Sequence, residues 1–541
     1  MKNKVRGLEQ PVGTRHALSL QHALSLQIIP KWPILLFLII VSGMLAISWS
    51  HNDHHLIYPL DDTYIHLSIA KQLSENGNWG LTEGRFDFSS SGPLFTLIVA
   101  GLMKVFGNFP QIPLFLNLLS GIFIISFFRS ILDQYSIFSR LKAGLITGFI
   151  LLTPLPLLVL NGMEHCLQVL IDLSFVWVLS KRLSRKNNAL FYLMFLAALT
   201  GIIRYEGIFL IGIGSLLLFI QKDFKTGTAM FIAGLLPIFL LGLFSISQEG
   251  TFFPISVLGK GHLPGFVFDD WLIWFRDGIL RLWENPFVPA TLGVLAVILT
   301  ELYRASKKSL SFYFILITLL VSFIHSFAAE IGGYRYEAYL IALSLTGIMI
   351  GISELNSWNV SLFTKNPGRL FFQILLLMSL LSLGVRSGYF HYYYPRATQN
   401  IYHQQYQMAQ FLKNNFPDAS VAVNDIGAVT YFTDIQLTDL VGIGDQDIYQ
   451  LRKNHNWNTE TIEAICSERK VELAIVHDIW VGSVIPKSWE KIGEWIIPDN
   501  FICADKRVSF YVVNKEKAEK INKSFKDFLG KLPEGVEAVL F

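Results

Sequence analysis

Long apolar segments alternate with short polar ones along most of this chain. An α-helix needs about 20 apolar residues to cross a bilayer, and eleven segments approach that length. They lie at about 33–50, 110–128, 143–159, 165–180, 188–203, 208–221, 228–247, 285–302, 309–328, 338–353 and 370–388. A further run, Leu94 to Phe106, is shorter and is interrupted by Lys104. The pattern predicts a polytopic α-helical membrane protein.

One polar segment, Tyr58 to Pro93, carries unusual chemistry. Directly after the first apolar run it places two adjacent carboxylates, Asp61 and Asp62. A short helical pattern follows and breaks at Asn76-Gly77-Asn78, which is a turn signal. Two acids beside a membrane cost solvation free energy unless something pairs with them or uses them. We therefore expect a functional site in this loop.

The character of the chain changes near residue 390. Short segments rich in β-branched and aromatic residues lie between turn signals, a pattern typical of strands. We expect strands within 420–432, 471–481 and 507–515, and helices over Tyr402–Asn414 and Asn458–Arg469. These elements predict a small α/β domain of about 150 residues. The predicted organisation is a tail over 1–32, a membrane domain over 33–388 with a first outer loop at 51–109, and the α/β domain over 389–541.

Composition supports the membrane prediction and excludes several classes of protein. Hydrophobic residues make up 52% of the chain and charged residues only 16%, whereas soluble domains carry about 25% charged residues. No Gly-rich nucleotide loop and no serine hydrolase elbow is present. The basic clusters are short turns, which gives no support to nucleic-acid binding. Three cysteines exclude a disulfide scaffold, although Cys466 and Cys503 could pair outside the cytoplasm.

The distribution of lysine and arginine predicts the orientation of the spans. If the run Leu94 to Phe106 lies on the outer face as a re-entrant or interfacial helix, the basic leader and the later basic clusters all become cytoplasmic. Those clusters are Arg129, Arg140 and Lys142; Lys181, Arg182, Arg185 and Lys186; Lys222 and Lys225; Arg304, Lys307 and Lys308; and Lys365 and Arg369. About eleven spans then result, with a cytoplasmic N-terminus and an extracytoplasmic C-terminal domain. Short cytoplasmic turns suit a bacterial inner membrane.

The same orientation gathers the unusual polar residues on the outer side. Asp61 and Asp62 lie there, together with the connections between later spans. These connections are Leu160-Asn161-Gly162-Met163-Glu164-His165, Arg204-Tyr205-Glu206-Gly207, 248–284 and Glu330–Glu337. The outer turns thus carry acids and arginines at helix ends, while the inner turns carry ordinary basic clusters. This asymmetry predicts an active site that faces outward.

Several of these elements resemble the GT-C superfamily of lipid-linked-sugar glycosyltransferases. That superfamily includes the protein O-mannosyltransferases and the aminoarabinose transferases of lipid A, and the pattern is most similar to the mycobacterial terminal arabinofuranosyltransferases. The matching elements are Asp61-Asp62-Thr63-Tyr64-Ile65, Ser90-Ser91-Gly92-Pro93-Leu94-Phe95, Gly162-Met163-Glu164-His165, Arg204-Tyr205-Glu206-Gly207, Arg335-Tyr336, Asn424-Asp425-Ile426-Gly427-Ala428 and Thr438-Asp439-Leu440-Val441-Gly442. Gly92, His165 and Tyr205 depart from the family's pattern, and these departures concern the sugar specificity more than the reaction class.

The resemblance implies a GT-C fold with helices at the outer membrane surface and an inverting reaction that uses a polyprenyl-phosphate sugar donor. It implies that Asp61 is the catalytic base and that Asp62 supports it or binds the acceptor, which is an envelope glycan, lipid or protein. A base must reach the acceptor hydroxyl, and the leaving phosphate needs cationic stabilisation. The residues expected to bind substrate are Glu164, Arg204, Glu206, Arg335 and His66.

Each of these residues also has a purely structural interpretation. The two acids can cap the helix that starts near Thr63. Glu164 can likewise interact favourably with the dipole at the N-terminus of a helix. Arg204 and Glu206 can pair with each other, Arg335 can anchor at the interface, and His66 can serve in packing.

Two further questions stay open in the sequence. A divalent metal on Asp61, Asp62 and His66 is conceivable, since oligosaccharyltransferases of the superfamily use one, but we expect no cofactor.

A transporter or flippase of lipid-linked glycan predicts symmetric halves and mid-membrane ionisable residues, and neither is clear in this chain. A non-catalytic, glycan-binding envelope scaffold would leave the acid pair dispensable.

Overall fold

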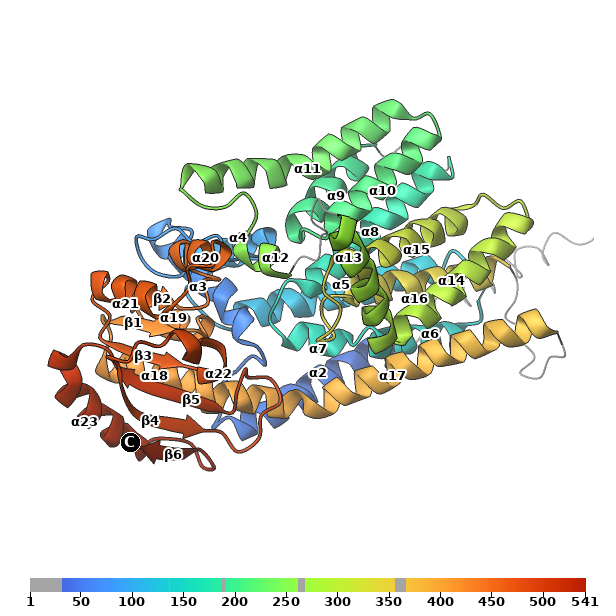
Figure 1. Ribbon diagram of the computed structural model, residues 1–541. Helices are drawn as coiled ribbons and strands as arrows, with labels where there is room; N and C mark the ends of the chain where they lie inside the picture. The colour runs from blue at the N-terminus through green and yellow to red at the C-terminus, as the bar shows by residue number, and fades with distance from the viewer. Residues whose placement is uncertain (1–31, 136, 186–189, 261–267, 356–365) are drawn as a thin grey trace, which may run out of the picture.

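The computed structural model describes residues 32–135, 137–185, 190–260, 268–355 and 366–541. It contains a large helical bundle and a smaller sheet domain, joined by the long helix α17, Pro367–Ile401 (Figure 1). The bundle helices are α2 (Trp32–His51), α5 (Ile112–Leu132), α6 (Ser139–Leu152), α7 (Leu155–Leu160), α8 (His165–Leu183), α9 (Leu190–Ile203), α10 (Gly207–Ile220), α11 (Phe224–Ser247), α14 (Phe287–Arg304), α15 (Leu310–Ala328), α16 (Ala338–Glu354) and α17 (Pro367–Ile401).

Every predicted span is helical where the chain is described, with one division. The segment 143–159 is two helices, α6 and α7, because Pro154 lacks the amide hydrogen that would continue the helix. Among the described residues, six helices are long and apolar enough to cross a membrane: α2, α5, α11, α14, α15 and the helix that begins at Pro367. The full number of spans and their orientation stay predictions, and the basic leader, Lys186 and Lys365 lie outside the described residues.

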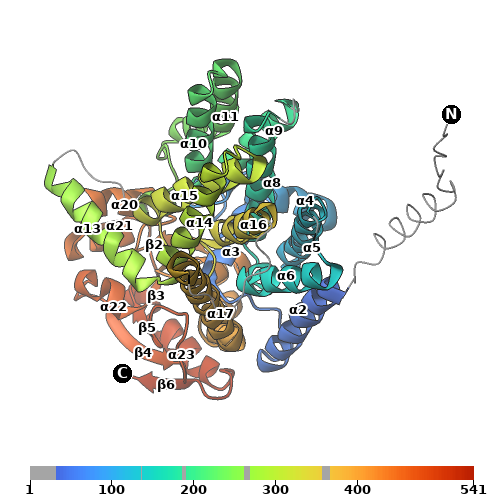
Figure 2. The same ribbon diagram turned by 90° about the vertical axis from the view of Figure 1, so that its right-hand side faces the viewer.

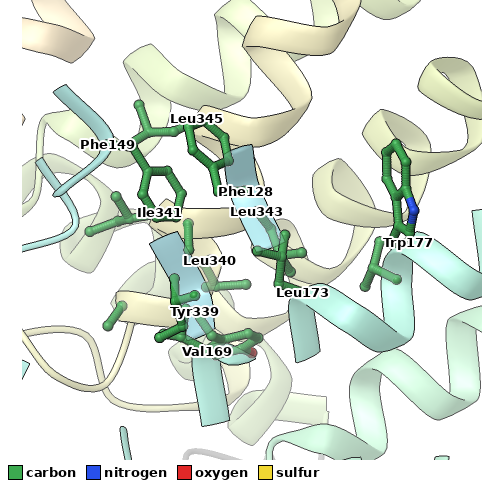
Figure 3. Packing of buried hydrophobic residues seen from close by; sticks show 14 of the residues in the cluster. Phe128, Phe149, Val169, Leu173, Trp177, Tyr339, Leu340, Ile341, Leu343 and Leu345 are labelled. Carbon is green, nitrogen blue, oxygen red and sulfur yellow. The ribbon is translucent and has the colours of Figure 1, made fainter. Parts of the chain in front are cut away.

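The bundle is packed around α16, of which residues Ala338 to Ser353 are all buried (Figure 2). Its side chains meet aromatic and aliphatic residues of α5, α6 and α8, and Phe128 stacks on Phe149 with ring centroids 4.1 Å apart (Figure 3). By contrast, α11 exposes a row of large apolar side chains. They are Phe231, Ile232, Leu236, Phe239, Leu240, Leu243 and Phe244. Such a surface fits a lipid environment.

Four further helices lie between the predicted spans along the chain: α3 (Asp61–Asn76), α4 (Pro93–Phe106), α12 (Ile255–Lys260) and α13 (Phe268–Glu284). α3 lies between the bundle and the sheet domain and packs against α4 on one side and α19 (Gly427–Phe432) on the other (Figure 1). α4 is the segment predicted to be re-entrant or interfacial; its 14 residues form one helix, and whether it enters the membrane stays a prediction.

The C-terminal domain is built on a six-stranded sheet with the order β2-β1-β3-β5-β4-β6. β1 (Ser420–Val423) pairs in parallel with β2 (Gln436–Asp439) and β3 (Leu473–Val476), whereas β4 (Glu490–Ile496), β5 (Arg507–Val512) and β6 (Glu537–Leu540) are antiparallel. The connecting helices are α18 (Gln407–Asn415), α19 (Gly427–Phe432), α20 (Gln446–Lys453), α21 (Thr459–Glu468), α22 (Asp478–Val481) and α23 (Ala518–Leu529). Three short turns complete the domain: a π-helix (Tyr402–Tyr406) and 3-10 turns at Gly482–Val484 and Lys515–Lys517.

Both faces of this sheet are covered. Val421 and Ile475 pack with α18 and α23 on one face, while Ala422 and Ala474 pack with α20 and α21 on the other. This alternation follows from the two-residue period of a strand. The predicted α/β domain is therefore present.

Details of the domain differ from the sequence predictions. The strands predicted within 420–432 and 471–481 end at Val423 and Val476, and short helices follow them. Cys466 and Cys503 are free thiols, so the suggested pairing is wrong for this structure. Cys466 packs under the sheet, and the Cys503 thiol donates to Gln405 Oε1 at 3.4 Å. α17 runs through residue 389 and continues into α18, so the boundary set there falls inside a helix.

Candidate active site between the bundle and the sheet domain

The site begins at the first turn of α3, where the two adjacent acids point to different partners. Helix α3 starts at Asp61, rather than near Thr63, after an extended Leu60. Thr63 Oγ1 donates to the carbonyl of Asn161 at 2.6 Å, which ties this turn to the connection before α8. Gly162 has φ +69°, and a Cβ there would lie 2.5 Å from the Tyr58 ring. The close approach of these two segments therefore requires glycine at this position.

Asp61 is held by the C-terminal domain. Its Oδ2 accepts the backbone amide of Gly427 at 2.7 Å, and its Oδ1 accepts that of Ala428 at 2.8 Å. Burial and the nearby carboxylate of Asp425 raise the pKa of Asp61 to about 7, although the two amide hydrogen bonds oppose this change. The side chain is only half-buried. Each carboxylate oxygen can accept more than one hydrogen bond, so Asp61 keeps the capacity to accept a proton.

Asp62 belongs to a second cluster. Its Oδ2 lies 2.8 Å from Nη2 of Arg335, and this guanidinium also donates to the hydroxyl of Tyr336 at 2.9 Å and to the Met163 sulfur at 3.0 Å. The Asp62 side chain is 36% exposed and that of Arg335 is 11% exposed. This ion pair is therefore reached from solvent on the acid side, while the arginine is largely enclosed.

A third cluster lies deeper, at the ends of α8 and α9. Arg204 Nη1 pairs with Oε1 of Glu164, and its Nε and Nη2 reach both oxygens of Glu206 at 3.1 and 2.7 Å. His66 Nε2 lies 3.3 Å from the other oxygen of Glu164, while His66 Nδ1 contacts the Thr96 hydroxyl at 3.0 Å. Glu164 is fully buried. Burial opposes its ionisation, but His66 and Arg204 lower the pKa of Glu164 below its usual range.

The departure at Gly92 has a physical reason in this cluster. A Cβ at Gly92 would lie 2.8 Å from the side-chain carbons of Glu164. The neighbouring Ser91 donates its hydroxyl to Glu164 Oε1 at 3.2 Å. Glycine thus lets the start of α4 close over the buried carboxylate, which a serine side chain would prevent.

The ring of Tyr336 connects the two arginine clusters. The guanidinium of Arg335 lies 4.8 Å from its centroid and that of Arg204 lies 5.6 Å from it. The buried His165 ring meets it edge-on at 6.1 Å. All seven residues predicted for the site therefore lie in one region. They are Asp61, Asp62, His66, Glu164, Arg204, Glu206 and Arg335.

The metal set considered for Asp61, Asp62 and His66 is not assembled. The His66 ring turns to Thr96, Ser90 and Glu164. Within the residues that the structure describes, no group of three His, Cys, Asp or Glu side chains is placed to hold a metal ion.

Sequence reasoning did not assign a role to the pair Asp425 and His477, which lies next to Asp61. Asp425 Oδ2 is 3.1 Å from His477 Nε2 and accepts from Gln405 Nε2 at 2.6 Å. A signal for it exists, because each residue follows the end of a strand that pairs in parallel with its neighbour. The carboxyl ends of parallel strands meet at one edge of a sheet, where ligand and functional groups gather.

Comparison with known proteins gives the following likenesses. A family model described as a domain of unknown function (DUF8728) matches residues 399–511. Two structures of ArnT from Cupriavidus metallidurans, one bound to undecaprenyl phosphate and one in the apo state, are similar with TM-score 0.49 and 12% identity, over 88% of this chain and 98% of theirs. The arabinofuranosyltransferase AftD from Mycobacteria is similar with TM-score 0.42 and 11% identity, over 88% of this chain and 40% of AftD. No curated protein sequence matches the chain.

Proposed function

We propose that this chain is a membrane-embedded inverting glycosyltransferase. It moves a sugar from a polyprenyl-phosphate carrier to a hydroxyl of an envelope glycan, lipid or protein. The reaction takes place on the periplasmic side of a bacterial inner membrane. The observation that carries the proposal is the juxtaposition of Asp61, a half-buried carboxylate of raised pKa, with the Asp62–Arg335 pair at the ends of apolar helices.

Asp61 suits the role of general base. A base works best when its pKa lies near the operating pH, and the pKa of Asp61 is raised to about 7. The two backbone amides fix the direction of its carboxylate without supplying a competing positive side chain. Asp62 is ion-paired with Arg335, which weakens it as a base but suits it to orient that arginine or the acceptor.

Arg335 is the better candidate for the leaving phosphate. It has one acidic partner among its hydrogen bonds, whereas Arg204 is held by two carboxylates. An arginine can bind phosphate with a pair of parallel hydrogen bonds. Arg204, with Glu164, Glu206 and His66, then shapes the site from behind instead of touching the donor.

The proposed reaction is a single displacement at the anomeric carbon of the sugar. Asp61 takes the proton of the acceptor hydroxyl, and the acceptor oxygen attacks the anomeric carbon of the sugar. The bond from that carbon to the phosphate oxygen breaks, and the prenyl phosphate leaves with the electron pair beside Arg335. Loss of the proton from Asp61 to solvent restores the base.

The test uses the full chain in lipid nanodiscs with a panel of polyprenyl phosphates that carry arabinofuranose, mannose or aminoarabinose. Crude envelope glycan serves as acceptor, and release of prenyl phosphate is measured for the wild type and for Asp61→Asn. We expect one donor to support turnover by the wild type, and the variant to bind that donor without turnover. Equal turnover in both would remove Asp61 as the base. Translocation of a fluorescent lipid-linked sugar without transfer would instead favour a flippase.

A further inference from the structure

A single short segment of the C-terminal domain reaches both Asp61 and a buried histidine. It runs from Asp425, after β1, to Ala428 in the first turn of α19. The amides of Gly427 and Ala428 hold the Asp61 carboxylate, and the side chain of Asp425 contacts His477 at 3.1 Å. A contact that fixes the position of Asp425 therefore also fixes the two backbone amides that hydrogen-bond to Asp61.

The hydrogen bonds of His477 determine where its protons are. Its Nδ1 lies 2.8 Å from the carbonyl oxygen of Arg507, and a carbonyl can only accept, so Nδ1 carries a hydrogen. Its Nε2 then faces Asp425 Oδ2, which also accepts from Gln405. A hydrogen bond there requires a second proton, shared between Nε2 and Oδ2. Asp425 raises the pKa of His477 although burial lowers it.

The charged, titratable and hydrogen-bonding groups around this pair come from three elements. Asp61 faces Asp425 from α3 and is followed by Asp62; Gln405 comes from the π-helix; and Cys503 and Asp505 come from the loop before β5. Burial keeps Cys503 a neutral thiol by raising its pKa well above the usual value. The charged side chains that act on Asp61, Asp425 and Asp62, are thus both acidic, and His477 contacts Asp425.

We propose that His477, acting through Asp425, is a positioning residue for the transfer reaction: it holds the Asp425–Ala428 segment against Asp61 and offsets the negative charge of Asp425 there. The C-terminal domain would then complete the active site instead of only covering it. This inference rests on the proposed role of Asp61 as the base.

Replacing His477 and replacing Asp425 should shift the pKa of Asp61 in opposite directions. Replacing His477 by glutamine keeps a donor but removes the positive charge, so Asp61 should hold its proton to higher pH. Replacing Asp425 by asparagine removes a negative charge that raises the pKa of Asp61, so Asp61 should lose its proton at lower pH. Because a neighbouring charge shifts a pKa by about one unit or more, the acid side of the kcat/KM profile should move up by about one pH unit in His477→Gln and down by about one in Asp425→Asn.

The double variant separates an indirect role from a direct one. If His477 acts through Asp425, then adding His477→Gln to Asp425→Asn should leave the profile of Asp425→Asn unchanged. Asp434→Asn is the matched control, because Asp434 pairs with Lys71 across the same interface and is 74% exposed. Its profile should match that of the wild type. Profiles that fall by the same factor at every pH in both single variants, or that do not move, would overturn the proposal.

A second readout does not need turnover. A water-soluble carbodiimide modifies protonated carboxyl groups, and peptide mass spectrometry gives the pH at which half of Asp61 is modified. The same opposite shifts of about one pH unit are expected in the two single variants. If these shifts occur while no donor supports transfer, the proposed function is wrong and the coupling of His477 to Asp61 stands. If transfer occurs without the shifts, the coupling is wrong.

Discussion

The charged side chains are buried and paired differently in the two halves of the candidate site. In the deep half, Glu164 and Arg204 are almost completely buried, and Arg204 is shared between two carboxylates. In the half next to the sheet domain, Asp61 is held by neutral amides and Asp62 keeps 36% of its side chain exposed. Oppositely charged side chains that are buried together stabilise the folded state only when every partner is present. Charges that are partly paired remain available to a substrate. We therefore expect the deep half to support the fold and the half next to the sheet domain to carry the reaction.

The largest expected effect follows from removing the centre of the deep half. Arg204→Met would leave Glu206 without its guanidinium partner and Glu164 with His66 as its remaining partner. Breaking a buried ion pair in this way costs about 3–5 kcal/mol. We expect a strong loss of thermal stability in detergent, measured by the unfolding of the purified protein. A variant as stable as the wild type would show that the deep network is not a structural support.

The corresponding change in the other half should affect catalysis instead. Arg335→Met removes the cation proposed for the leaving phosphate, and loss of one group that stabilises developing charge lowers kcat by about 10²–10³-fold. Its partner Asp62 stays in contact with water, so the unfolding temperature should change far less than in Arg204→Met. Measuring kcat and unfolding for both arginine variants tests the contrast directly. Equal destabilisation by the two substitutions would contradict the division.

The contact between the domains can be loosened with one methyl group. A Cβ at Gly427 would lie 2.1 Å from the backbone oxygen of Asp61 and 2.9 Å from its carboxylate carbon. Gly427→Ala should therefore push the segment away from Asp61, at a cost of about 1–3 kcal/mol for overpacking, and lower transfer more than donor binding. Gly530→Ala is the matched control, because a Cβ there meets nothing within 4 Å. Similar activity in the two variants would argue against the contact.

The smallest effect is a pH dependence in the unmodified protein. Asp61 must be ionised to accept a proton, and its pKa is raised to about 7. The value of kcat/KM should then fall by about tenfold for each pH unit below that pKa. An acid limb near pH 4, which is the ordinary range of a carboxyl group, would place the base on a less enclosed acid such as Asp62.

The sequence by itself determined the local features of this protein. Apolar length marked the bundle helices, and the turn at Gly77 ended α3 as expected, with that glycine in the left-handed conformation. Asn458 begins α21 with a capping box, which agrees with the predicted helix. These features depend on neighbours within a few residues, so their causes are visible in the chain. The seven candidate site residues were found because their types are costly beside a membrane and because their order resembles a family.

Only the tertiary structure decided how those residues are paired. No local signal says that Asp61 receives amides from residues 427 and 428, or that Asp62 and not Asp61 faces Arg335. The strands predicted within 420–432 and 471–481 ended early for the same kind of reason: residues after Val423 and Val476 turn into short helices, of which α19 packs against α3, and Asp425 pairs with His477. A carboxylate's pKa depends on burial and on charges brought from distant parts of the chain, and those are properties of the assembled fold.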